Sequence, residues 1–312
     1  MNPAFPVIFF TTLSGAGFGL WAWLGLRIAF GADPVGFQTL GWLLLLVFAG
    51  IAVAVGLLAS FWHLGRPLRA WRAFSQWRTS WLSREGVLAV ACFVPALALL
   101  LLLRGSAPHG LDLATRLTAA ALATLSIATV ACTAMIYASL KPIPAWRHRL
   151  VVPGYLLFAL LTGGLPMLTS TAGGASRLDG ALPWLLAGIA LGLLALKLAY
   201  WRSIDQAGLP AQRGDAIGLP QRQATVFERP HTEANFITRE MAFVVARRHA
   251  RVLRLVSVLL FAAAPLLCLF MLQQPDAPSW LLSVATGCAL AGAFLERWLF
   301  FAQARHLVTL YY

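Results

Sequence analysis

The sequence predicts an all-α integral membrane protein with eight transmembrane helices. Of its 312 residues, 60% are hydrophobic and only 11% are charged, whereas a soluble domain carries roughly 25% charged residues. The apolar residues form several continuous runs of about 20 residues, which is the length an α-helix needs to cross a bilayer. A membrane β-barrel would instead show short segments of alternating polarity. These observations exclude a soluble domain and a barrel.

We expect the whole chain, residues 1–312, to form a single domain of eight spans, and an arrangement in two four-helix halves is one option. The expected limits of the spans are Pro6–Phe30, Thr39–Trp62, Glu85–Leu103, Leu113–Ser139, Val151–Thr171, Ala181–Trp201, Val252–Leu272 and Ser279–Phe301. Small residues such as Gly15, Gly17, Gly163 and Gly164 suit close helix packing. Prolines inside three spans predict kinks that neighbouring helices stabilise: Pro95, Pro166 and Pro265.

The basic residues gather on one side of this arrangement. An even number of spans puts both termini on the same side as the second, fourth and sixth connections. All but four of the 24 Lys and Arg residues belong to that side, the exceptions being Arg27, Arg104, Arg116 and Arg177. The positive-inside rule therefore places both termini in the cytoplasm. The net charge of +13 is explained by these loops, without a nucleic-acid partner.

The connection Phe61–Glu85 combines arginine and tryptophan, with His63 near its start and Glu85 at its end. Indole rings favour the headgroup level of a bilayer, and guanidinium groups bind phosphates. An ordinary positively charged loop would have the same composition. The two end residues distinguish this segment, because ionisable groups at the edge of the hydrocarbon are costly and mark functional sites.

The sixth connection, residues 202–251, is the only long one. Its first half is polar and rich in Gly and Pro, which predicts irregular structure. Its second half has a helical pattern of apolar and basic residues, which predicts a helix on the cytoplasmic membrane surface, although a plain linker remains an alternative. Ser83-Arg84-Glu85 before the third span is weakly repeated by Thr238-Arg239-Glu240 before the seventh. Such a repeat would fit a duplicated four-helix unit.

Several kinds of site are disfavoured by the residues that the spans contain. The four cysteines are far apart without CxxC spacing, which argues against iron–sulfur clusters and zinc in this chain. No histidine lies in the middle of a span, so haem is not expected. Haem could bind only through a pair of axial histidines near the cytoplasmic face. The span interiors also lack Asp, Glu and His, which argues against an ion-coupled transporter.

Quinone chemistry at the membrane boundary fits the remaining residues. Reduction of a quinone needs a hydrogen-bond donor, an acid or base near water and an apolar slot for the tail. An imidazole and a carboxylate at a span mouth supply the first two, as His63 and Glu85 would. Arg66 or Arg69 could hold Glu85 ionised or polarise the quinone oxygen. A structural salt bridge between Glu85 and a loop arginine explains the same residues equally well.

A longer pattern in this connection is similar to a known family. His63-Leu64-Gly65-Arg66-Pro67-Leu68-Arg69-Ala70-Trp71, followed by Ser80-Trp81-Leu82-Ser83-Arg84-Glu85, resembles the membrane-anchor subunits of the dimethyl sulfoxide reductase family. The eight spans and the basic run before the seventh fit the same family, so the resemblance covers essentially the whole chain.

The resemblance implies an anchor that binds a molybdopterin catalytic subunit and a four-cluster iron–sulfur subunit to the bacterial inner membrane. Such an anchor exchanges electrons with ubiquinone or menaquinone and has no haem, metal or other cofactor of its own. It implies a quinone site at His63, Gly65, Arg69 and Glu85, near Arg66. Trp71 stands where the family pattern has an aromatic that we expect to be phenylalanine. The loop with Arg239, Glu240, Arg247 and Arg248 would face the iron–sulfur subunit.

The side of the membrane refines this resemblance. Dimethyl sulfoxide reductases carry their catalytic subunits on the periplasmic face, whereas the matching face here is the basic, cytoplasmic one. The chain, including its opening residues, is therefore more similar to the branch of cytoplasm-facing sulfite dehydrogenases (sulfite:quinone oxidoreductases). The resemblance to this branch implies that electrons pass from sulfite to quinone. A dimethyl sulfoxide or other oxyanion reductase running in the opposite direction, a structural anchor and a small-molecule transporter are the alternatives.

Overall fold

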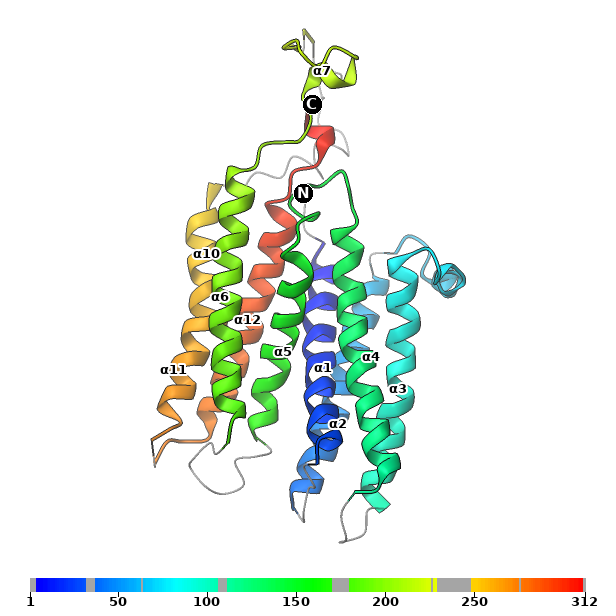
Figure 1. The fold of residues 1–312 in the computed structure, drawn as a ribbon, viewed down its shortest axis with the longest axis vertical. Helices are drawn as coiled ribbons and strands as arrows, with labels where there is room; N and C mark the ends of the chain where they lie inside the picture. The colour runs from blue at the N-terminus through cyan, green and yellow to red at the C-terminus, as the bar shows by residue number, and fades with distance from the viewer. Residues whose placement is uncertain are drawn as a thin grey trace.

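The described part of the chain is a bundle of long helices (Figure 1). The structure is a computed structural model that describes residues 4–31, 37–62, 64–105, 111–169, 180–225, 227–228, 248–274 and 276–310. Within them, 8 helices are long and apolar enough to cross a membrane, which confirms the predicted all-α membrane fold. These are α1 (Phe5–Ala29), α2 (Phe37–Phe61), α3 (Trp81–Gly105), α4 (Leu113–Ala138), α5 (Val151–Thr169), α6 (Leu182–Gln206), the composite of α10 (Ala250–Val258) and α11 (Ala264–Met271), and α12 (Trp280–Ala302).

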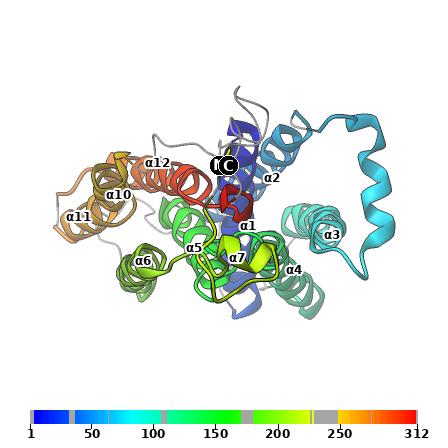
Figure 2. The same ribbon diagram turned by 90° about the horizontal axis from the view of Figure 1, so that it is seen from above.

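The helices pack in two groups of four. In the first group, α1 and α3 each pack against α2 and α4. In the second group, α12 packs against α5 and α10–α11, and α6 packs against α5 and α11. Viewed from above, α1 lies at the junction, where it packs closely against α5 and also against α12 (Figure 2). The duplication of a four-helix unit stays a prediction, because the second copy of the suspected repeat, residues 238–240, lies outside the described residues.

The junction between α1 and α5 depends on glycine. A Cβ atom on Gly19 would lie 1.8 Å from the carbonyl oxygen of Ala159, and one on Gly163 would lie 2.2 Å from the backbone nitrogen of Leu20. No other residue permits the two backbones to approach so closely. The two halves are therefore joined by backbone contact.

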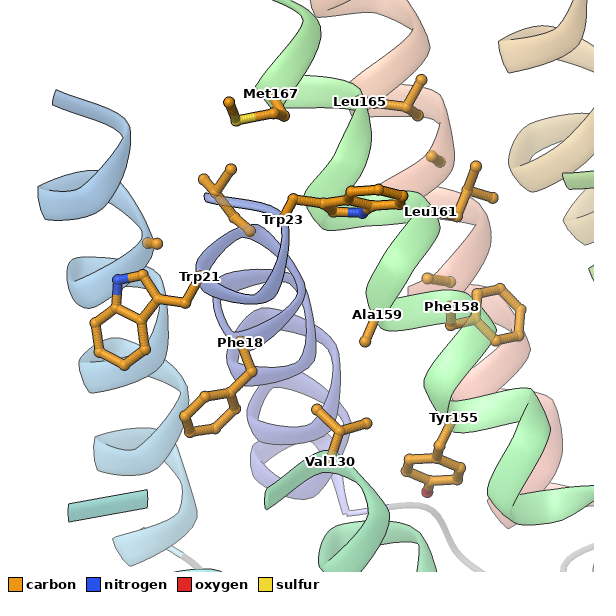
Figure 3. Packing of buried hydrophobic residues seen from close by; sticks show 14 of the residues in the cluster. Phe18, Trp21, Trp23, Val130, Tyr155, Phe158, Ala159, Leu161, Leu165 and Met167 are labelled. Carbon is orange, nitrogen blue, oxygen red and sulfur yellow. The ribbon is translucent and has the colours of Figure 1, made fainter. Parts of the chain in front are cut away.

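Two tryptophans of α1 fix it to helices on opposite sides. The indole N–H of Trp21 donates to the carbonyl of Leu46 in α2 at 3.0 Å, and that of Trp23 donates to Leu160 in α5 at 2.8 Å. Figure 3 shows these two rings extending from α1 in different directions, with that of Trp23 beside α5. Each buried indole thus satisfies its donor across a helix interface, as buried tryptophans usually do.

Both chain ends and three connections lie at the same end of the bundle. Helix α1 begins there, α12 ends there, and the α2–α3, α4–α5 and α6–α10 connections are there too (Figure 1). We call this end the basic end, because the arginines of those connections belong to it. The even number of spans predicts this shared end.

The seventh span is not a regular helix. Between α10 and α11 the chain forms a π-helix, η2 (Leu259–Ala263), immediately before Pro265. Proline has no N–H to donate to the preceding turn, and a widened turn accommodates that loss. The predicted irregularity at Pro265 is therefore found, whereas α3 and α5 continue through Pro95 and Pro166.

The sixth connection is described only in part. Its first half is irregular, as expected, apart from the short α7 (Arg213–Ala216), which is capped by Gln212 and Asp215. The guanidinium of Arg213 donates to the carbonyl of Leu310 in the C-terminal 3-10 helix η3 (Leu307–Leu310) at 2.5 Å. Most of the expected surface helix lies in residues 229–247, outside the described residues.

Candidate functional site

The connection between α2 and α3 forms an arm at the basic end. Pro67 starts a 3-10 helix, η1 (Pro67–Gln76), that has no buried residue. Figure 2 shows η1 extending sideways from the bundle beyond α2 and α3. Arginines lie over tryptophan rings in three places, Arg72 over Trp71, Arg78 over Trp77 and Arg84 over Trp81. Paired indole and guanidinium groups suit the lipid–water boundary.

Arg84 closes this arm onto α3. Its guanidinium donates to the carbonyls of Trp77 at 3.0 Å and Arg78 at 2.5 Å. Phe74 of η1 also packs over Gly86, where a Cβ atom would lie 3.1 Å from its ring. The arm is therefore attached to the first turn of α3, next to Glu85.

Glu85 lies inside the bundle, and this corrects the predicted start of the third span. Helix α3 begins at Trp81, so Glu85 is one turn within it and only 4% exposed. The hydroxyl of Thr133 in α4 donates to the Glu85 carboxylate. Among the described residues no cation is paired with Glu85, so the structural salt bridge to a described loop arginine is not found.

Thr133 can accommodate either protonation state of Glu85. Its hydroxyl also lies 3.1 Å from the carbonyl of Thr129. It can therefore donate to an ionised carboxylate, or accept from a carboxylic acid while it donates to Thr129. A buried carboxyl with a neutral partner of this kind can exchange a proton without breaking an ion pair.

The structure does not join the other predicted site residues to this carboxyl. Gly65, Arg66, Arg69 and Trp71 are exposed on the arm, and no hydrogen bond or ion pair connects them to Glu85. His63, Arg239, Glu240 and Arg247 lie outside the described residues. Arg248 is exposed at the basic end, just before α10.

A buried ion cluster in the second half was missed by the sequence reasoning. Lys197 of α6 and Arg297 of α12 are each 4% exposed, and Glu296 of α12 is 0% exposed. Glu296 forms ion pairs with both cations, to Arg297 at 3.2 Å. The sequence pattern suggests that these charges lie near span ends, but the three side chains are buried in the bundle. Their position within apolar runs is the sequence feature that could have indicated this burial.

Aromatic rings enclose this ion cluster. The guanidinium carbon of Arg297 lies 3.4 Å from the ring centre of Tyr155 in α5, and the ammonium of Lys197 lies 4.1 Å from that of Tyr200 in α6. Such cation–π contacts compensate in part for the water lost on burial. Among the described residues, no group of three His, Cys, Asp or Glu side chains could hold a metal ion.

A pocket of about 260 Å³ opens at the basic end between the α4–α5 connection, the end of α6, α10 and the residues that follow α12. His148 lines it and its ring lies 3.1 Å from the hydroxyl of Ser203. Burial, with the charges of Arg149 and Lys197, lowers the pKa of the His148 imidazole. Arg254 lines it too, donating to Asp205 at 2.5 Å. No sequence pattern indicates this pocket, because its residues come from four distant segments.

Comparison with known proteins identifies the family. The family described as DMSO reductase anchor subunit (DmsC) matches residues 1–303. The chain belongs to the DMSO reductase anchor subunit family. This confirms the resemblance carried by the His63–Trp71 and Ser80–Glu85 segments.

One relative is similar over its whole length. The chain is 35% identical over 331 aligned residues to a sulfite dehydrogenase subunit of Allochromatium vinosum, covering 100% of this chain and 99% of that protein. As a member of the DMSO reductase anchor subunit family, this chain is the membrane component of a multi-subunit complex.

Proposed function

We propose that the chain is the quinone-binding anchor of a sulfite dehydrogenase in the bacterial inner membrane. Its partners would be a molybdopterin subunit, which oxidises sulfite on the cytoplasmic side, and a four-cluster iron–sulfur subunit, which carries the electrons to the membrane. The observation that carries the proposal is Glu85, a buried carboxyl below the Arg- and Trp-rich arm, hydrogen-bonded only to a neutral hydroxyl among the described residues. The similarity to a sulfite dehydrogenase subunit supports the substrate.

The reaction requires protons at the membrane boundary. Oxidation of sulfite by water gives sulfate, two electrons and two protons, and a bound quinone takes up two electrons and two protons to become quinol. Glu85 would hold the proton that goes to one quinone oxygen, because its second oxygen is free of the Thr133 contact. The apolar residues around the arm, including Trp62 and Leu68, suit an isoprenoid tail.

The arm would position the quinone ring. At Gly65 a Cβ atom would meet nothing within 4 Å, so the backbone is open to a flat ring. Arg69 would orient the ring or stabilise negative charge on its oxygen, with Arg66 and Trp71 beside it. His63, outside the described residues, would donate to the other quinone oxygen.

Docking would take place at the basic end. The positive-inside rule supports a cytoplasmic location for this end and for both termini. Arg248 is exposed there, and we propose that it binds the iron–sulfur subunit together with Arg239, Glu240 and Arg247. Basic side chains would suit an acidic patch on that subunit.

The test uses the intact complex, purified through a tag on this chain and assayed for molybdenum and iron. Sulfite oxidation is measured with a ubiquinone analogue and, separately, with a soluble electron acceptor that bypasses the membrane component. Glu85→Gln should abolish quinone reduction and quinone-site inhibitor binding but leave the soluble reaction unchanged. Asp112→Asn, at the opposite end of the bundle, is the matched carboxyl control. If Glu85→Gln reduces quinone at the normal rate, the site assignment is wrong.

One observation favours a second candidate of another class. A transporter is disfavoured when span interiors lack charged groups, and the buried Lys197, Glu296 and Arg297 show that these interiors do contain them. Charges at this depth are common in transporters. A transporter would move a solute when the chain alone is reconstituted in vesicles, whereas an anchor would not. An oxyanion reductase that takes electrons from quinol would be identified by the co-purifying catalytic subunit.

A further inference from the structure

Two small cavities lie between Glu85 and the ion cluster. The first is lined by Thr12 of α1, Thr133 of α4, and Tyr155 and Arg297. Its other polar lining residues, Thr11, Ser14 and Thr162, donate their hydroxyls to backbone carbonyls of their own helices. The second is lined by Tyr155, Lys197, Tyr200 and Arg297. Each has a volume of about 10 Å³, which is at the lower limit for one water molecule and excludes a quinone or a lipid. Tyr155 lines both cavities.

The first cavity contains polar groups that need a partner. The hydroxyls of Thr12 and Tyr155 are buried and form no hydrogen bond with another described protein group. Their residues are only 7% and 3% exposed. A buried hydroxyl without a partner is destabilising, and a bound water removes that cost. Figure 3 shows Tyr155 extending from α5 to the region of Val130 on α4, which lines the same cavity.

The charges of Glu85 and of the ion cluster, on the two sides of these cavities, balance. Lys197 and Arg297 are cations, and Glu296 and Glu85 are anions, so the set is neutral when all four are ionised. If one proton moves from Lys197 to Glu85, both become neutral, and Arg297 and Glu296 remain paired. Both states therefore avoid a net buried charge, which an apolar interior strongly disfavours.

We propose that water molecules bound in these two cavities form a proton relay from Lys197 to Glu85. The relay rests on the function proposed above and specifies how the buried carboxyl regains its proton. Lys197 gives a proton to the second water, Tyr155 passes one to the first, and Thr133 passes one to Glu85. Each hydroxyl and each water accepts one proton and releases one, so only Lys197 and Glu85 change their charge.

Other titratable groups near the relay lie at its ends. Cys132 of α4 lies in the field of Glu85, and Arg254 lies in that of Lys197. Tyr137 of α4 is the exception, because its ring stacks on that of Tyr155 in the middle of the relay, with the ring centres 6.0 Å apart. Tyr200, beside Lys197, donates to the carbonyl of Ala145 at 2.9 Å, and its ring lies 5.4 Å from that of His148. His148 in turn lines the pocket at the basic end, so we assign proton entry to that side.

The test combines structure and kinetics in the intact complex. A high-resolution map should show an ordered water in contact with Thr12 and Tyr155, and Tyr155→Phe should remove it. With sulfite as donor, Tyr155→Phe and Lys197→Met should each lower the turnover of quinone by about tenfold or more. They should also raise the solvent deuterium isotope effect, and leave the KM for quinone and the soluble-acceptor reaction unchanged.

Ser126→Ala is the control for loss of a buried hydroxyl. Ser126 also has no hydrogen-bond partner among the described residues, but it lines a different cavity, which is lined by none of the relay residues Thr133, Tyr155 and Lys197. Its variant should keep the normal rate and isotope effect. The relay is refuted if Tyr155→Phe and Lys197→Met behave like Ser126→Ala, or if they slow the soluble reaction equally. Loss of quinone turnover in Glu85→Gln would then still support the proposed function, whereas normal turnover there would refute it.

Discussion

The buried ion cluster gives the sharpest stability prediction. Glu296 is the single anion between two buried cations, Lys197 and Arg297. Replacing it by Gln keeps the volume but leaves both cations unpaired in an apolar interior. Removing one partner of a buried ion pair costs about 3–5 kcal/mol, and here two cations lose theirs, so we expect Glu296→Gln to cost at least about that much.

Lys197→Met should be milder. It leaves Arg297 paired with Glu296, so the remaining two charges of the cluster cancel. The remaining loss is one charged hydrogen bond, about 1.5–3 kcal/mol, and the methionine retains much of the apolar contact. The structure therefore predicts an asymmetry, in which removal of the anion costs more than removal of this cation.

The assay is denaturant unfolding of the purified chain in detergent, followed by helical circular dichroism. Asp205→Asn is the control, because Asp205 pairs with Arg254 while its side chain is 58% exposed. Because the carboxylate of this pair is largely exposed, although the Arg254 side chain is only 15% exposed, we expect its loss to cost much less than that of the fully buried Glu296. The reasoning is refuted if Lys197→Met is as destabilising as Glu296→Gln, or if Glu296→Gln matches Asp205→Asn.

Three further predictions test the packing and the basic end. Gly19→Ala should prevent stable folding, since its Cβ would overlap a backbone carbonyl of α5, whereas Gly15→Ala, with nothing within 4 Å, should fold normally in a detergent thermal-shift assay. Trp23→Phe removes a 2.8 Å bond between α1 and α5 and should lower the unfolding free energy by about 1–3 kcal/mol. The lowered pKa of His148 means that the unfolded chain binds its proton more readily, so its contribution to stability is complete above about pH 6.5 and is lost below it. His148→Gln should therefore reduce the fall in melting temperature between about pH 7 and pH 5.

The spans could be predicted from sequence because hydropathy and length alone determine them. Seven of the observed helices begin within a few residues of their expected start, and α3 begins four residues early at Trp81. That shift changes the interpretation of Glu85 from a group at the mouth of a span to one within the bundle. Hydropathy could not show it, because the first turn of α3 contains the polar residues Ser83 and Arg84.

The ion cluster could not be predicted by counting charges in loops. Lys197 lies in the second half of α6, so its sequence position resembles that of a residue near a span end that reaches towards water. Only the packing of α6 against α11 and of α12 against α5 shows that Lys197 and Glu296 meet. Contacts between helices far apart in sequence leave no local pattern.

The two buried glutamates differ in what they can do, because their partners differ. Glu296 is held between two cations, and its protonation would leave an uncompensated positive charge in the interior, so it is suited to remain ionised. Glu85 has a neutral hydroxyl that can donate or accept, so its protonation removes a charge without abandoning a partner. The bundle thus separates a carboxylate that stabilises the second half from a carboxyl that can exchange protons in the first half. If quinone chemistry takes place on this chain, Glu85 is the buried carboxyl suited to it.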